Sequence, residues 1–136
     1  MTRRVDGTGE PTYPYGKDPQ GLIIYTDTGH VSVHLMHRNR PRFASGDMAN
    51  GTDAEIRACY ERYGAYFGHY EVDMENSVVY HKVEGSLFPN WEGGTQKRFF
   101  KLMGNRLELR GPPALFRGAQ TVGVLEWERV GGLGNE

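Results

Sequence analysis

Side chains alternate with a period of two residues over most of the chain. In residues 77–84, "SVVYHKVE", two valines and the histidine fall on one face, and the tyrosine, lysine and glutamate fall on the other. Because successive side chains of a β-strand point to opposite faces of a sheet, this pattern predicts strands that are buried on one side. A chain built mainly from such strands is typical of an antiparallel sandwich or barrel.

Six further segments show the same β-strand character and are separated by turn residues. They are residues 21–26, 30–36, 65–72, 97–103, 106–110 and 121–130. The short connections "DTG" at 27–29 and "GN" at 104–105 predict tight hairpins, because glycine and asparagine adopt the positive φ angles that such turns require.

One segment has a helical period instead, over about residues 53–64. Its apolar side chains recur at positions i, i+3, i+4 and i+7 and are Ile56, Cys59, Tyr60 and Tyr63. Thr52 and Glu55 predict a capping box at its start, and Gly64 is expected to end it. We expect the apolar stripe to pack on the barrel rather than to be displayed to a partner, so that the helix closes or flanks one end and Cys59 is a buried, inert thiol.

Composition excludes several classes of function. The chain has 16 basic and 17 acidic residues, which gives no charge excess for nucleic acid or an anionic membrane. No apolar run approaches a membrane span, and the first residues lack the apolar core of a secretory signal, so a cytoplasmic protein is expected.

Metal and cofactor motifs are also missing from the sequence. Cys59 is the single cysteine, and the five histidines do not form the i, i+4 helical pair of zinc proteases. The glycines form neither a dinucleotide fingerprint nor a phosphate-binding loop. We therefore expect no metal and no cofactor.

A resemblance to a known family is carried by four segments that occur in order and with similar spacing. They are "YPYGKDPQGLIIYTDTGHVSVHLMHRNRPRF", "GTDAEIRACYERYGAYFGHYEV", "VEGSLFPNW" and "LEWER". These segments resemble the lipocalin-like domain family, which comprises small β-barrel proteins of bacteria and fungi. The resemblance implies a calycin-type antiparallel barrel with an internal cavity over residues 13–130, between a flexible N-terminal remnant at 1–12 and a disordered tail at 131–136.

The chain departs from the family at its first strand. Family members usually open with a strand similar to "GTWRLVS", where this chain has "TRRVD". The first strand is therefore expected to be shortened or missing. A missing strand would expose a sheet edge and favour a homodimer.

Polar residues on the inward face are the candidates for chemistry, because the interior of a small barrel is otherwise apolar. His81 is either a core histidine satisfied by a neighbour or a cavity histidine that moves protons. Arg98 either pairs with Glu84 or Glu71 across the barrel or binds a ligand. With Tyr70, these two form the predicted catalytic set.

The predicted ligand-binding residues lie on the same face or in the loop 84–94, "EGSLFPNWEGG". They are Tyr66, Val79, Val83, Phe88, Asn90, Trp91, Phe100, Leu125 and Trp127. The loop is either a turn packed on its own core or part of the wall or mouth of a pocket.

Three functions follow from the sequence and the resemblance. The first is binding of a small, largely hydrophobic molecule in the cavity, in a secondary-metabolite context. The second, implied by the resemblance, is a cofactor-free enzyme that acts as a cyclase, isomerase or dehydratase on a polyketide or terpenoid. The third is a structural or interaction protein with a filled barrel.

Overall fold

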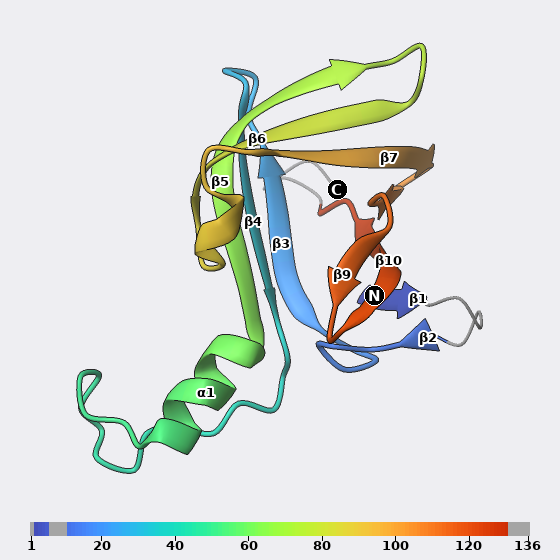
Figure 1. Cartoon of the computed structure of the whole chain (residues 1–136). Helices are drawn as coiled ribbons and strands as arrows, with labels where there is room; N and C mark the ends of the chain where they lie inside the picture. The colour runs from blue at the N-terminus through green and yellow to red at the C-terminus, as the bar shows by residue number, and fades with distance from the viewer. Residues whose placement is uncertain (1, 6–10, 131–136) are drawn as a thin grey trace.

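The described part of the chain forms one strongly curved antiparallel sheet in a computed structural model (Figure 1). The structure describes residues 2–5 and 11–130. The strands lie in the order β2-β1-β10-β8-β7-β6-β5-β4-β3, and β9 pairs with β10 beside this path. Their bounds are Thr2–Val5 (β1), Pro11–Thr12 (β2), Gln20–Tyr25 (β3), His30–Met36 (β4), Tyr63–Asp73 (β5), Val78–Ser86 (β6), Thr95–Met103 (β7), Arg106–Arg110 (β8), Ala114–Phe116 (β9) and Ala119–Glu128 (β10).

The predicted antiparallel β-fold is confirmed, but a closed barrel is not shown. Within the described residues, β3 and β2 stand at the two ends of the sheet path and do not pair with each other. The first strand is short rather than missing, because β1 pairs with β10 from Thr2↔Leu125 to Val5↔Val122. Within the expected N-terminal remnant, residues 1 and 6–10 lie outside the described residues, and so does the expected tail at 131–136.

Two predicted hairpins are present. Gly29 has φ 88° in the turn from β3 to β4, and Gly104 has φ 58° in the turn from β7 to β8. A register shift between Phe67 and Gly68 interrupts the pairing of β5 with β6. A Cβ atom at Gly68 would lie 1.9 Å from the carbonyl oxygen of Lys82, so only glycine fits this irregularity.

The helix α1, Asp53–Glu61, begins as predicted but packs differently. The capping box is confirmed, since Thr52 Oγ1 accepts from Glu55 N–H and the Glu55 carboxylate accepts from Thr52 N–H. The helix ends before Gly64, which belongs to β5. None of its residues is buried, and Cys59 is exposed, so the predictions of a packed stripe and a buried thiol were wrong.

The reason lies in the connection that precedes α1. Residues 37–52 carry the chain away from the sheet, and α1 lies beyond the start of β5 (Figure 1). Its polar contacts go back to this connection: Glu55 Oε2 accepts from Ala44 N–H, and Arg40 donates to the Cys59 carbonyl. The stripe residues Ile56 and Tyr60 consequently stay 51% and 47% exposed.

The core lies on the inner face of the curved sheet, over β3 to β6. Val31, Val33, Tyr66 and Val83 form a buried cluster. Partly buried side chains packed against it are Ile23, Tyr25, Tyr70, Trp91 and Trp127. This face therefore brings together residues from both halves of the chain.

Candidate functional site

A hydrogen-bonded chain of three side chains lies at the centre of the inner face. His81 on β6 is 1% exposed, and its two ring nitrogens contact hydroxyl groups from two other strands. Tyr25 Oη lies 2.7 Å from His81 Nε2, and Tyr66 Oη lies 2.5 Å from His81 Nδ1. The alternation that predicted an inward His81 between Val79 and Val83 is confirmed, because all three side chains are buried.

Burial controls the protonation of Tyr25, His81 and Tyr66. Burial, and to a smaller extent the charge of the nearby Arg98 guanidinium, together lower the pKa of His81 to about 4. Burial also raises the pKa of Tyr25 and of Tyr66, while the Arg98 charge opposes both shifts. At neutral pH the three side chains are therefore uncharged, and His81 carries one N–H.

Arg98 contacts groups of its own strand and the Tyr66 hydroxyl rather than a carboxylate. Its guanidinium donates to Gln96 Oε1 at 3.0 Å and to the Lys97 carbonyl at 3.2 Å. The two glutamates expected as partners contact other residues: Glu71 pairs with Lys82, and Glu84 lies 3.2 Å from His69 Nδ1. These contacts are on the outer face, since period two separates them from the inward side chains. The prediction that Arg98 pairs with Glu84 or Glu71 was therefore wrong.

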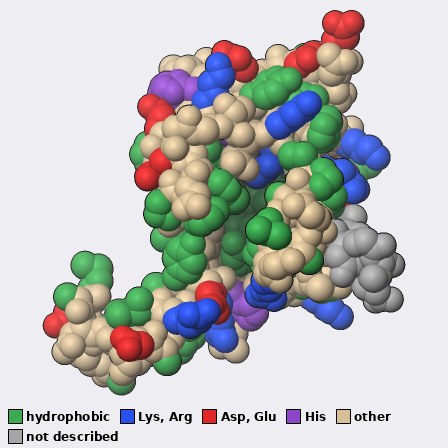
Figure 2. All heavy atoms as spheres, viewed as in Figure 1, with side chains coloured by type: hydrophobic (Ala, Val, Ile, Leu, Met, Phe, Trp, Pro, Cys, Tyr) green, Lys and Arg blue, Asp and Glu red, His purple; other side chains and the backbone are tan. Residues whose placement is uncertain are grey.

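A cleft of about 980 Å³ opens beside the side chains of Tyr25, His81 and Tyr66, along β3 at the end of the sheet path. It lies between β3 on one side and the β7–β8 turn with the end of β10 on the other. In the view of Figure 2 the surface is hollowed over β3, and hydrophobic side chains gather there. The apolar lining residues are Leu22, Ile23, Ile24, Tyr25, Leu35, Leu102, Leu107 and Trp127.

The predicted site residues lie in three places: the cleft, the core behind the cleft, and the loop after β6. Trp127 lines the cleft. His81, Tyr66, Val79 and Val83 are buried behind it in the sheet core, with Tyr70, Arg98, Phe100 and Leu125 partly buried on the same face. Tyr70 donates to the Thr26 carbonyl at 2.7 Å, a contact that ties the β3–β4 hairpin to β5.

The loop after β6 is a packed turn. It contains a 3-10 helix, Pro89–Trp91, and the Trp91 ring packs edge-on against Tyr66 and Phe88 at 5.8 and 5.5 Å between centroids. Phe88 and Asn90 are exposed, and neither lines the cleft. The Trp91 contacts fit the interpretation of a turn packed on its own core. Because Glu84, Gly93 and Gly94 at the two ends of the loop line a separate pocket of about 540 Å³, the interpretation as part of a pocket wall stays a prediction.

Sequence reasoning missed the most informative member of the site, Tyr25. A signal existed: the hairpin at 27–29 pairs Tyr25 with Val31, and period two puts Tyr25 on the same face as Ile23. Leu107 was also missed, because β8 is a short strand whose pairing with Trp127 depends on tertiary structure.

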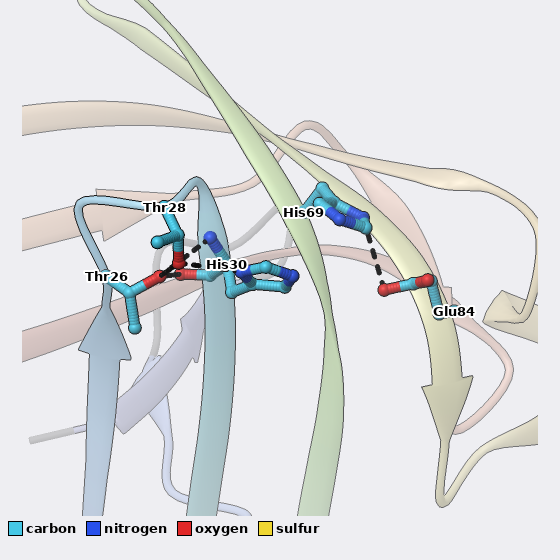
Figure 3. A network of polar contacts seen from close by, with 5 residues as sticks. All are labelled: Thr26, Thr28, His30, His69 and Glu84. Atoms are coloured by element: carbon cyan, nitrogen blue, oxygen red, sulfur yellow. Dashed lines mark hydrogen bonds and ion pairs between the residues drawn. The ribbon is translucent and has the colours of Figure 1, made fainter.

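The outer face of the same strands carries a second polar network (Figure 3). The rings of His30 and His69 lie 4.5 Å apart between centroids, and His69 contacts Glu84. His30 Nδ1 lies 2.9 Å from Thr28 Oγ1. Across residues 2–5 and 11–130, no group of three or more histidine, cysteine or acidic side chains has a metal-binding arrangement.

Comparisons with known proteins agree with the architecture. The sequence pattern of the lipocalin-like domain matches residues 2–130. The chain is 35% identical over 107 residues to a protein of Aspergillus oryzae (strain ATCC 42149 / RIB 40), which is described as the 4'-hydroxy-3'-methoxypropiophenone carrier protein ppsC. That alignment covers 74% of this chain and 96% of the relative. No solved structure matches. In the described part of the chain, no helix has the length and apolar character needed to cross a membrane.

Proposed function

The chain belongs to the lipocalin-like domain family, and from this premise we propose that it binds a small, largely hydrophobic molecule in the cleft beside β3. The observation that carries the proposal is the cleft itself, with its volume of about 980 Å³ and its apolar lining. Sites for small molecules typically have volumes of about 300–1,000 Å³ and mostly hydrophobic walls with a few polar groups. Here the polar groups of the lining are Tyr25, two amide side chains and five charged side chains: Gln20, Asn105, Arg38, Arg106, Glu126, Glu128 and Arg129.

The relative supports the carrier part of the proposal. Its name describes it as the carrier of a small aromatic ketone, and the match covers almost all of its length. We propose that this chain likewise holds a small molecule of secondary metabolism and releases it unchanged. The buried position of His81, behind the cleft wall, favours binding over proton transfer to a ligand.

Calorimetric titration with 4'-hydroxy-3'-methoxypropiophenone, and fluorescence titration with the apolar dye N-phenyl-1-naphthylamine, test the proposal. We expect saturable binding of at least one of them, with one site per chain. Leu107→Trp fills the cleft and should weaken binding at least about tenfold. Leu115→Trp is the matched control, because Leu115 is 70% exposed on β9 and does not line the cleft. Binding of neither molecule would count against the proposal and favour the filled-barrel alternative.

A second candidate function is cofactor-free catalysis on the bound molecule. One observation favours it. Tyr25, His81 and Tyr66 form a continuous path for a proton, and Arg98 lies near enough to Tyr25 and Tyr66 to stabilise a negative charge on either hydroxyl. In this case a polyketide or terpenoid substrate should be cyclised, isomerised or dehydrated. Turnover should collapse in His81→Gln and Arg98→Gln while circular dichroism still reports the folded sheet. Recovery of every bound molecule unchanged would exclude this alternative.

A further inference from the structure

The cleft wall contains a buried hydrogen-bond donor for which residues 2–5 and 11–130 supply no acceptor. This donor is Trp127 Nε1, which is covered from solvent and has no hydrogen-bond partner in the described part of the chain. Trp127 pairs with Leu107 across β10 and β8, and both side chains line the cleft opposite Ile23. A buried N–H without an acceptor costs about 1–3 kcal/mol, so such a group in a folded protein calls for a missing partner.

Tyr25, His81 and Tyr66 also carry one polar hydrogen more than their two mutual hydrogen bonds use. Neutral His81 donates through one ring nitrogen and accepts through the other, so one of its two tyrosine partners donates to it and the other accepts from it. The accepting tyrosine keeps its own hydroxyl hydrogen for another acceptor. Of the two tyrosines, Tyr25 lines the cleft.

The Trp127 N–H is a donor beside apolar walls, and Tyr25 adds a second donor in the tautomer in which His81 donates to it. We infer, on the basis of the proposed binding function, that the ligand is an apolar molecule with a hydrogen-bond acceptor, such as an aryl ketone, which pairs with the Trp127 indole N–H. Leu35, Leu102 and Leu107 then surround the hydrocarbon part. Because the nitrogen is covered, the acceptor reaches it when the side chains of the wall shift around the ligand.

A matched pair of probes isolates the acceptor. Propiophenone and propylbenzene share one carbon skeleton and differ in the ketone oxygen. Propylbenzene leaves the Trp127 N–H unpaired, whereas propiophenone forms the missing hydrogen bond. We expect propiophenone to bind about tenfold more tightly, which is the usual effect of one net hydrogen bond.

Calorimetry and nuclear magnetic resonance together test the inference. On addition of propiophenone, but not of propylbenzene, the indole proton of Trp127 should move downfield in a proton–nitrogen correlation spectrum. Its signal is identified by its loss in Trp127→Phe, which keeps an aromatic ring in the wall. In that variant the preference for the ketone should fall to about one. Leu107→Ala is the contrasting variant, since it should weaken both probes and keep the preference.

The outcomes separate the two proposals. Equal binding of both probes with no movement of the indole proton overturns the inference and leaves the binding function intact. A ketone preference that survives in Trp127→Phe also overturns it. Failure of the wild-type protein to bind either probe contradicts the binding function, and the inference with it. If Trp127→Phe does not fold, the indole shift in the wild-type protein decides.

Discussion

Strands β5 and β6 carry histidine networks on both faces, and the two faces give them opposite surroundings. On the inner face His81 is 1% exposed and lies between the hydroxyl groups of Tyr25 and Tyr66. On the outer face His69 contacts Glu84, and both side chains are 51% exposed (Figure 3). The same residue type is therefore buried and fully hydrogen-bonded on one face and half exposed on the other, where water competes for its hydrogen bonds.

The largest expected difference between the two faces appears when the imidazole is removed. His81→Ala leaves two buried tyrosine hydroxyls without their partner and opens a cavity, so it should lower the free energy of unfolding by about 3 kcal/mol. Urea denaturation at pH 7.5 measures this loss. A loss below about 1 kcal/mol would show that Tyr25 and Tyr66 find other hydrogen-bond partners and that their contacts with His81 do not stabilise the fold.

Acidification should also act on the inner face. The pKa of His81 is lowered to about 4 by burial, with Arg98 acting in the same direction, while the pKa in the unfolded chain is near 6.5. The folded state favours the neutral ring, so this contribution is complete above pH 6.5 and is lost as the pH falls from 6.5 towards 4. Between pH 7.5 and pH 5 the loss amounts to about 2 kcal/mol.

A pH series of urea denaturation curves for wild type and His81→Gln measures that contribution, since glutamine does not titrate. The groups that face His81 are Tyr25 on β3, Tyr66 on β5 and Arg98 on β7, and none of them changes its charge in this range. The difference between the two proteins should therefore shrink as the pH falls. A difference that stays constant from pH 7.5 to pH 5 would contradict the lowered pKa.

The comparison also explains how far the sequence could predict this molecule. Period two placed His81 inside and Glu84 outside, because the face of a strand residue depends only on its position along the strand. The partners of His81 were beyond this reasoning. Tyr25 and Tyr66 lie 56 and 15 residues away in sequence, and the register that brings them to the ring is a property of three strands together.

The helix shows the same limit from the other side. The capping box at Thr52 and Glu55 was predictable, since it needs only residues three apart. Burial of the stripe at Ile56 and Tyr60 was not, because it depends on the path of the connection before the helix. The open cleft has the same origin: the alternation predicts a barrel, but the gap beside β3 depends on how far the sheet curves.

The smallest expected effect belongs to the outer face. His69→Ala removes the contact with Glu84 and the tilted ring contact with His30, yet the side chains of His69 and Glu84 are half exposed. Exposed pairs of this kind contribute about 0–1 kcal/mol, so we expect a loss below about 0.5 kcal/mol in the same urea assay. A double-mutant cycle with Glu84→Gln should give a similarly small coupling energy. A loss as large as that of His81→Ala would instead mean that the ring contact between His30 and His69 fixes the register of β4 on β5. The contrast between the two faces would then reflect different partners rather than different exposure to water.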